Sequence, residues 1–237
     1  MAENDSKFPV PEEGTYPARL VWCVDEGTHE NTYNGDTKPK HQVYLGFELL
    51  GTKKSAEDPS PFVVIYYGTV SNGKFGLSVN SSSKLYEMLS KWHPEIVKTS
   101  KKPSKDGTFK KSIYISDLRK LVKENAAAFV SVSVSGSQAN PSRLRASLDF
   151  VKPPKADYQA AETPTVDYWL WENEWNVGAK KYDWVIVKPD YPSHFPEWEK
   201  AKVESSYEWK FGKVPTPEPK EAAFKTDANF NDEDIPF

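Results

Sequence analysis

The end of the chain combines residue types that a partner protein could bind. Proline stiffens the backbone there, the terminal Phe offers an apolar ring, and the neighbouring carboxylates suit a pocket rimmed by Arg or Lys. A tail that only increased solubility would not need an apolar end. The sequence therefore predicts a protein-docking tip made of Asp232, Glu233, Asp234, Ile235, Pro236 and Phe237.

Basic residues are concentrated in the first two thirds of the chain. The net charge is −3, but residues 38–145 contain 18 Lys and Arg against 8 Asp and Glu. Residues 151–212 contain 8 against 11, and residues 213–237 contain 3 against 6. A basic region followed by an acidic tail indicates a domain that binds phosphates and a tail that recruits proteins or competes for the basic surface.

Composition favours an all-β protein. The chain has 19 prolines and 14% aromatic residues, and proline interrupts helices whereas aromatic residues favour strands. It contains no apolar run of about 18 residues, and its first residues lack the features of a signal peptide, so we expect a cytoplasmic location. Cys23 is the only cysteine and the four histidines are scattered, so the sequence predicts no disulfide, metal site or cofactor.

Alternating apolar residues predict five strands, and their order is typical of a five-stranded OB-fold barrel. The expected strands span residues 15–27, 40–50, 61–70, 126–137 and 142–151. A helix is expected from about Ser82 to Trp92, between the third and fourth strands, and a short helical turn at 116–125.

The alternation also assigns side chains to the two faces of these strands. The core face is expected to hold Tyr16, Ala18, Leu20, Trp22, Val24, Val43, Leu45, Phe47, Leu49, Ala128, Val130, Val132, Val134, Leu144, Ala146, Leu148 and Phe150. The opposite face is expected to hold Arg19, Val21, Cys23, Asp25, Lys40, Gln42, Tyr44, Glu48, Phe129, Ser131, Ser133, Arg143 and Arg145. The third strand is apolar on both faces, so either Tyr66 or Tyr67 must face outward.

The chain is therefore expected to have three parts. Residues 1–13 form a flexible arm, and residues 14–211 form the OB-fold barrel with a post-barrel extension. Residues 212–237 form a disordered linker, rich in proline and charge, that ends in the docking tip.

Several segments in order resemble a phage-encoded family of single-stranded DNA-binding OB-fold proteins. They are GTYPARLVWCVDEGTHE, KPKHQVYLGFEL, PFVVIYYGTVS, SVNSSSKLYEMLSKW, LRASLDFVKPP and FPEWEKAKVESSYEW. The ending DEDIPF resembles the acidic C-terminal tip of bacterial and phage single-stranded DNA-binding proteins. The resemblance implies that the protein coats single-stranded DNA in the host cytoplasm and recruits replication, recombination and repair enzymes. The Trp-rich and acidic stretch at 167–187 has no counterpart in it.

Single-strand binding requires aromatic rings for base stacking and cations for the phosphates, on one open surface. The stacking is tolerant of sequence because every base has a flat face. The candidate DNA-binding residues are Arg19, Lys38, Lys40, Tyr44, Tyr66, Tyr67, Lys74, Phe75, Phe129, Arg143 and Arg145. Trp22 and Trp92 are expected in the core, so they should not contact DNA.

Other functions stay open at this point. Trp169, Trp171 and Trp175 lie near Glu172 and Glu174, a combination that carbohydrate-binding modules and glycosidases use. A second alternative is a protein-interaction adaptor that only displays the tail. Such an adaptor would not need the surplus of Lys and Arg over Asp and Glu. No nucleophile arrangement or phosphate-binding glycine loop is present in the sequence, so we expect no enzyme activity. Duplex DNA is a further candidate ligand through the basic hairpin and a lysine-rich loop, and homo-oligomerisation is left open.

Overall fold

The computed structural model describes residues 9–33, 35–73, 76–101, 103, 107–136, 144–176 and 181–213. Lys74, Phe75 and Arg143, the chain beyond Lys213 and the docking tip lie outside them.

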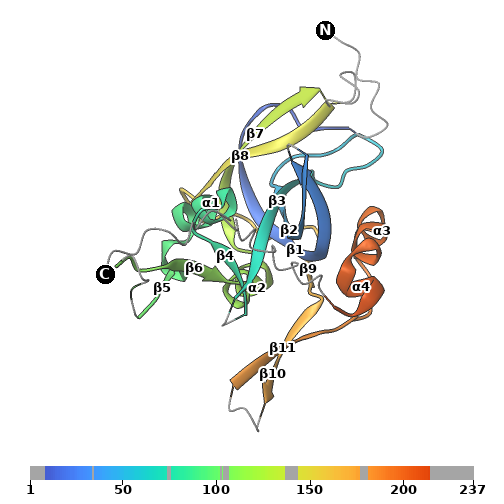
Figure 1. The fold of residues 1–237 in the computed structure, drawn as a ribbon. Helices are drawn as coiled ribbons and strands as arrows, with labels where there is room; N and C mark the ends of the chain where they lie inside the picture. The colour runs from blue at the N-terminus through green and yellow to red at the C-terminus, as the bar shows by residue number, and fades with distance from the viewer. Residues whose placement is uncertain are drawn as a thin grey trace, which may run out of the picture.

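Antiparallel strands dominate the fold (Figure 1). The strands are β1 Gly14–Tyr33, β2 Asp36–Leu49, β3 Val63–Gly73, β4 Gly76–Asn80, β5 Lys98–Thr99, β6 Lys111–Tyr114, β7 Ala127–Gly136, β8 Leu144–Lys152, β9 Val166–Tyr168, β10 Trp171–Asn176 and β11 Lys181–Ile186. The helices are α1 Lys84–Trp92, the 3-10 turn η1 Pro94–Ile96, α2 Ile115–Lys123, α3 Glu197–Ser205 and α4 Tyr207–Phe211.

The hydrogen-bonded order of the large sheet is β5-β6-β4-β3-β2-β1-β7-β8, and β9 pairs with β1 in parallel. Strands β10 and β11 form a separate hairpin that projects from the body of the protein (Figure 1). The five expected strands correspond to β1, β2, β3, β7 and β8. In the described part of the chain no ladder joins β3 to β8, so the sheet does not close.

Strand β2 follows the expected alternation on its core face, where Val43, Leu45, Phe47 and Leu49 are fully buried. On its other face Tyr44 and Glu48 are buried as well, whereas Lys40 is exposed. Glu48 is held there because its carboxylate accepts a hydrogen bond from the backbone N–H of Glu162 at 2.9 Å. The segment after β8 therefore covers part of a face that the sequence pattern predicts as exposed.

Strand β1 departs from strict alternation. Its pairing with β2 shifts between Leu20 and Trp22 and again between Asp25 and Gly27, and each irregularity changes which face the next side chain meets. Val21, Cys23 and Asp25 were expected to face outward, and this is wrong: all three are fully buried. Trp22 was expected in the core, but it is only partly buried and lines a surface groove.

The two expected helical segments are confirmed. Helix α1 begins after Ser83, whose hydroxyl accepts a hydrogen bond from the backbone N–H of Tyr86. Its apolar side contributes Leu85, Leu89 and Trp92 to the core, so Trp92 is buried as expected. Helix α2 spans the expected helical turn, whereas β4 and β6 were not predicted.

Strand β8 contains an irregularity that changes the direction of Phe150. The pairing with β7 shifts at Ser131 and Val132, which face Phe150 and Leu148 on β8. Leu148 is buried as expected. Beyond the shift, the residue buried in the core is Val151 and not Phe150. The prediction that Phe150 faces the core is therefore wrong, and its ring lines a surface cavity.

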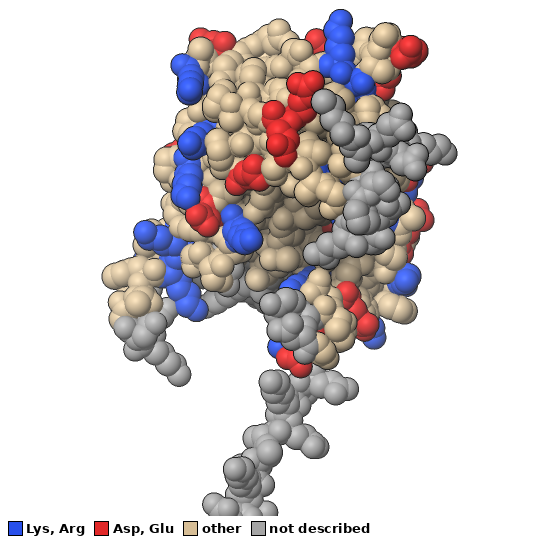
Figure 2. All heavy atoms as spheres, turned by 90° about the horizontal axis from the view of Figure 1, so that it is seen from above, with Lys and Arg blue, Asp and Glu red and all other residues tan. Residues whose placement is uncertain are grey.

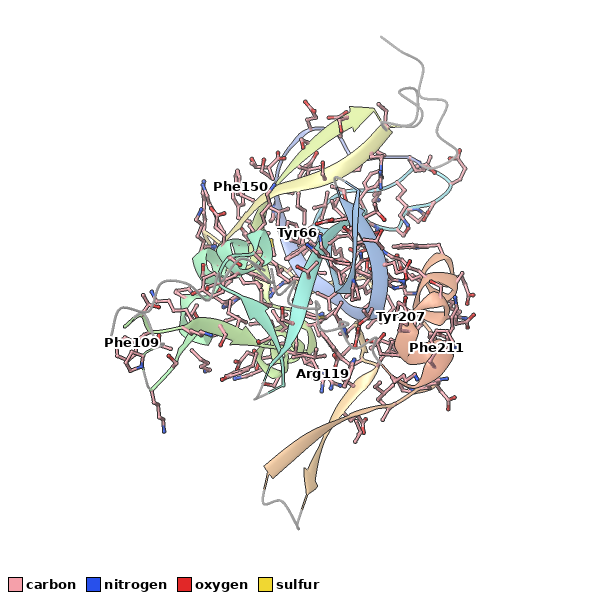
Figure 3. The ribbon with its side chains drawn as sticks, in the orientation of Figure 1. Tyr66, Phe109, Arg119, Phe150, Tyr207 and Phe211 are labelled. Carbon is pink, nitrogen blue, oxygen red and sulfur yellow. The ribbon has the colours of Figure 1, made fainter. Side chains whose placement is uncertain are left out.

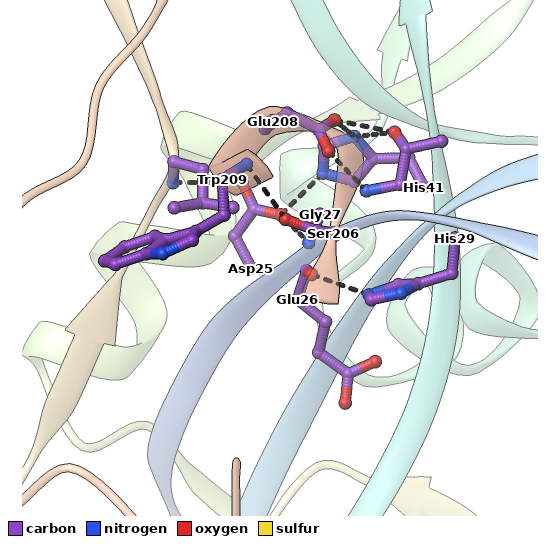
Figure 4. A network of polar contacts seen from close by, with 10 residues as sticks. Asp25, Glu26, Gly27, His29, His41, Ser206, Glu208 and Trp209 are labelled. Atoms are coloured by element: carbon purple, nitrogen blue, oxygen red, sulfur yellow. Dashed lines mark hydrogen bonds and ion pairs between the residues drawn. The ribbon is translucent and has the colours of Figure 1, made fainter. Parts of the chain in front are cut away.

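A buried histidine joins the C-terminal helix α4 to the sheet (Figure 4). His41 Nε2 lies 2.6 Å from Asp25 Oδ1, and His41 Nδ1 lies 3.4 Å from Glu208 Oε1. Burial alone would lower the pKa of His41, but the two carboxylates raise it to about 9, so the imidazole is charged at neutral pH. Thr28 donates from its N–H and its hydroxyl to Glu208, each at 2.6 Å. We call Asp25, Thr28, His41 and Glu208 the His41 clamp.

Near the start of the described region, Glu13 is attached to the sheet. The backbone N–H of Val134 donates to the Glu13 carboxylate at 2.9 Å, which places the end of the predicted N-terminal arm on β7. Gly212 ends α4 with a φ of 62°. Among the described residues no helix has the length and apolar character needed to span a membrane.

The contact between β1 and α4 predicts a position-specific cost of adding one methyl group. Gly27 has a φ of +77°, and a Cβ there would lie 2.6 Å from Ser206 Cβ. Gly51 has a similar φ of +75° but open space around it, so Gly51→Ala is a matched control for backbone strain. We expect Gly27→Ala to lower the free energy of unfolding by about 1–3 kcal/mol more than Gly51→Ala, because α4 must shift. Urea denaturation measures both, and equal losses would contradict this packing.

Candidate nucleic-acid interface between β3 and β8

Two adjoining cavities lie where β3 and β8 face each other without pairing. Their volumes are about 580 and 640 Å³, and both are lined by Tyr66, Tyr67 and Lys84. Arg145 lines the first cavity and Phe150 the second, both from β8. Figure 3 shows Tyr66 on β3 and Phe150 on β8. We call this surface, made of Tyr66, Tyr67, Lys84, Arg145 and Phe150, the β3–β8 cleft.

Tyr67 is the most exposed ring of the cleft, with 49% of its surface accessible. The Lys202 ammonium of α3 lies 4.6 Å from the centre of its ring. Burial, followed by the charges of Glu199 and Glu26, raises the pKa of the Tyr67 hydroxyl, so the phenol stays neutral. Tyr66 packs partly against the core but still lines both cavities. Tyr67 is thus the outward residue of the pair.

The cleft carries positive charge that is not neutralised within it. Lys84 and Arg145 are exposed, and neither forms an ion pair with another described residue. Of the acidic groups of the cleft, Glu87 pairs with Lys91 at 2.7 Å, and the nearby Lys84 also helps to lower the pKa of Glu87. Asp149 accepts a hydrogen bond from the Ser133 hydroxyl and keeps its negative charge. The cleft therefore combines exposed aromatic surface with two cations, Lys84 and Arg145, that form no ion pair among the described residues.

Basic side chains continue beyond the cleft. Figure 2 shows Lys and Arg gathered along one edge of the molecule, on the side where Figure 1 places α1, β5 and β6. The exposed lysines of these elements and the loops beside them are Lys84, Lys91, Lys98, Lys101, Lys110 and Lys111. Positive potential thus extends from the cleft across this side of the protein.

Tyr44 was expected to be an exposed stacking residue, and this is wrong. It is fully buried, because α3 covers this part of β2 and the Trp198 ring stacks on Tyr44 with the ring centres 5.9 Å apart. Burial raises the pKa of its hydroxyl, with smaller effects from Glu199 and Glu26. Tyr44 supports Trp198 and is closed to a ligand.

Arg19 and Phe129 lie apart from the cleft and contact the segment after β8. The Arg19 guanidinium donates to the carbonyl oxygens of Gln159 at 2.9 Å and Asn125 at 3.1 Å. Phe129 is partly buried, and the Lys155 ammonium lies 4.8 Å from its ring centre. In this structure both residues attach that segment to the sheet.

Lys38 and Lys40 are exposed on the β1–β2 hairpin, and neither lines the cleft. Lys38 pairs with Asp36 at 3.2 Å. Of the expected DNA-binding residues, the structure brings together Tyr66, Tyr67 and Arg145. Lys74, Phe75 and Arg143 lie outside the described residues.

A buried pair of carboxylates positions α3 beside the cleft. Glu26 and Glu199 are 0% and 1% exposed, and Lys202 Nζ lies 2.6 Å from Glu26 Oε1. Burial raises the pKa of Glu199, and the neighbouring Glu26 raises it further, to about 8. This ion pair holds Lys202 over the Tyr67 ring.

Lys84, Phe150 and Lys202 line or border the cleft but were not predicted as site residues from the sequence. Lys84 follows the capping Ser83, so its place at the start of α1 was a signal that its side chain is exposed. Phe150 was assigned to the wrong face by strict alternation. Lys202 comes from a helix more than 120 residues from β3 in the chain, and no local pattern places it there.

The Trp-rich segment does not form an aromatic platform in its described part. Trp169 and Trp171 are 4% and 6% exposed. The Trp169 indole N–H donates to Asp167 at 2.7 Å, and the Arg119 guanidinium also binds Asp167. The side chains of Glu174 and Trp175 lie outside the described residues. The described tryptophans serve as core residues next to β9.

Comparisons with known proteins found no match among family models, curated proteins or solved structures. Within the described ranges, no group of three or more His, Cys, Asp or Glu side chains could hold a metal ion.

The raised pKa of Glu199 predicts a pH-dependent effect of Glu199→Gln on stability. A carboxyl whose pKa rises from 4.5 in the unfolded chain to about 8 costs stability progressively as the pH rises between those values. Glu199→Gln removes this cost, so its free energy of unfolding relative to the wild type should increase by about 1 kcal/mol or more from pH 5 to pH 8.5.

Denaturant unfolding at both pH values measures this difference. Glu197→Gln is the control, because Glu197 is exposed on the same helix. His41 also loses its proton near the upper end of this range, but it does so in all three proteins and drops out of the comparison. A Glu199→Gln effect that is the same at both pH values would refute the buried-pair assignment.

Proposed function

We propose that this protein binds single-stranded DNA in the β3–β8 cleft. The observation that carries the proposal is the convergence of Tyr66, Tyr67, Lys84, Arg145 and Phe150 at one open edge of the sheet. Bases can stack on the exposed rings, and the two cations can bind phosphates. Because stacking accepts any base, the binding is expected to have little sequence preference.

We further propose that β1, β2, β3, β7 and β8 form an OB-type sheet. The antiparallel order β3-β2-β1-β7-β8, with α1 following β3 and preceding β7, supports this interpretation. The cleft then lies between the third and fifth strands of the OB fold. In this proposal α3 and α4 are the post-barrel extension, which covers the outer face of β2.

The proposal extends to the biological role that the sequence resemblance implies. The protein coats single-stranded DNA during replication, recombination and repair in the cytoplasm, and the tip at 232–237 recruits partner proteins. It acts as a binding protein without enzyme activity. The burial of Trp169 and Trp171 argues against the carbohydrate-binding alternative, which needs exposed rings. The two cations in the cleft argue against an adaptor that only displays the tail.

Duplex DNA is a second candidate ligand. The exposed lysines around β5 and β6 can contact any phosphate backbone, and Phe109 beside them is 54% exposed. We expect this binding to be weaker and more sensitive to salt than single-strand binding, because it lacks base stacking.

Substitutions in the cleft should weaken single-strand binding without unfolding the protein. We expect Tyr67→Ala to lower the affinity for an oligothymidylate by about 5- to 100-fold, through the loss of base stacking. Arg145→Ala should remove about one phosphate contact, so the slope of the logarithm of the affinity against the logarithm of the salt concentration should become smaller by about 1. Fluorescence anisotropy at about 50 and 200 mM salt, with single-stranded and duplex DNA, measures both effects.

Phe211→Ala and Lys210→Ala are the controls. Phe211 is 61% exposed on α4, away from Tyr66 (Figure 3), and Lys210 beside it is an exposed cation. The control variants should bind as the wild type does, and all four should melt within a few degrees of it. Salt-independent binding, or equal losses in cleft and control variants, would refute the proposed interface.

The tip should act separately from the cleft. Deleting Ile235, Pro236 and Phe237 should abolish capture of a replication or recombination partner, while single-strand affinity stays the same, because the anchor lies outside the sheet domain. Deleting residues 226–237 should tighten DNA binding slightly at low salt, since the acidic groups no longer compete for the cations. Loss of DNA binding on either deletion would contradict this division of roles.

A further inference from the structure

A second groove opens on the outer face of the sheet, next to the β3–β8 cleft. It has a volume of about 810 Å³, and the Trp22 and Trp198 rings line it together with Ile65, Lys53 and Lys54. Three prolines complete its apolar wall. We call it the Trp22–Trp198 groove. The sequence pattern indicated no site here and predicted Trp22 in the core.

The groove is continuous with the cleft. Ile65 lines both the groove and one of the cleft cavities. Ile65 and Tyr67 are two residues apart on β3, so they share one face of the sheet. A ligand that extends along this face from Tyr67 therefore reaches the groove past Ile65.

Gly46 gives Trp22 its position in the groove wall. It pairs with Trp22 on β1 and with Ile65 on β3, so it lies between these two residues. A Cβ at Gly46 would lie 2.8 Å from Trp22 Cε3, and only the missing side chain lets the indole rest against the β2 backbone. The Trp22 ring therefore occupies the space that a Cβ at position 46 would otherwise fill.

Trp198 forms the opposite part of the groove and stays open to a ligand. Its ring stacks on Tyr44, with an interplanar angle of 28°, yet 55% of its surface is exposed. Helix α3 carries Trp198 and is fixed to β1 by the ion pair between Lys202 and Glu26. The Trp198 ring is therefore held in place by its contact with Tyr44 and by the fixed position of α3, and no ligand is needed.

The rim of the groove carries two lysines, Lys53 and Lys54, and two acids, Asp58 and Glu162. Lys53 is exposed and makes no ion pair with another described residue, and Lys54 lies 3.6 Å from Asp58. Aromatic rings beside a free ammonium group are the combination that base stacking and phosphate binding require.

We propose that the Trp22–Trp198 groove is a second base-binding subsite, which takes bases of the same single strand that occupies the β3–β8 cleft. This inference rests on the proposed function and extends the DNA path from β8 and β3 across the outer face to Trp22 on β1. The bases stack on Trp198, and Lys53 contacts a phosphate.

Two variants of Trp198 test the subsite with the full-length protein and an oligothymidylate of about 16 nucleotides, the upper site size for one OB fold. Trp198→Ala should lower the affinity by about 5- to 100-fold. Trp198→Phe keeps a ring but lacks indole emission, so it should retain affinity within about threefold and lose part of the tryptophan quenching that DNA causes. Phe211→Ala, with a ring of similar exposure on α4, should change neither property.

The outcomes separate this inference from the proposed function. If Tyr67→Ala weakens binding but Trp198→Ala and Trp198→Phe bind and quench as the wild type does, the subsite is refuted and the cleft stands. If the wild type does not bind single strands, both proposals fail. If Trp198→Ala unfolds, two other measurements test the subsite: the tryptophan quenching of Trp198→Phe and the single-strand affinity of Lys53→Ala. Quenching and affinity equal to those of the wild type would refute the subsite.

Discussion

The charged imidazole of His41, buried between Asp25 and Glu208, is the interaction on which the arrangement of the C-terminal helices depends. Burying one positive group between two carboxylates is favourable only if the remaining hydrogen-bonding capacity is used. The structure meets this condition: the N–H groups of Gly27 and Leu170 donate to Asp25, and Thr28 donates to Glu208. The clamp therefore fixes β1, β2, the chain before β10 and α4 relative to one another.

The position of the candidate interface follows from that clamp. Once α4 is fixed, α3 lies over β2, where it buries Tyr44 and brings Trp198 and Lys202 to the outer face of the sheet. The Glu26 carboxylate, buried beneath α3, holds Lys202. The aromatic rings that remain accessible therefore lie beside α3 and not on β2. Tyr67 and the cleft are on one side of the helix, and Trp22 is on the other.

The sequence pattern correctly predicted those parts of the fold that depend only on residues close together in the chain. The alternation of Val43 to Leu49 and the cap at Ser83 could be read because each depends on neighbouring residues. The irregularities in β1 and β8 could not, since they reflect pairing with other strands, and they reversed the predicted faces of Cys23 and Phe150. Burial of Tyr44 and the arrival of Lys202 depend on a helix far away in the chain. Tyr66, Tyr67 and Arg145 were identified from their types, but their convergence required the three-dimensional structure.

The most direct test of the central claim is photo-crosslinking of the full-length protein to single-stranded DNA that carries a photoreactive thymidine analogue, followed by mass spectrometry of the linked peptides. Most crosslinks are expected on the peptide of β3 that contains Tyr67 and on the peptide of β8 that contains Phe150, and excess unlabelled oligothymidylate should remove them. Crosslinks confined to the β1–β2 hairpin or to α4, with none on β3 or β8, would contradict this claim.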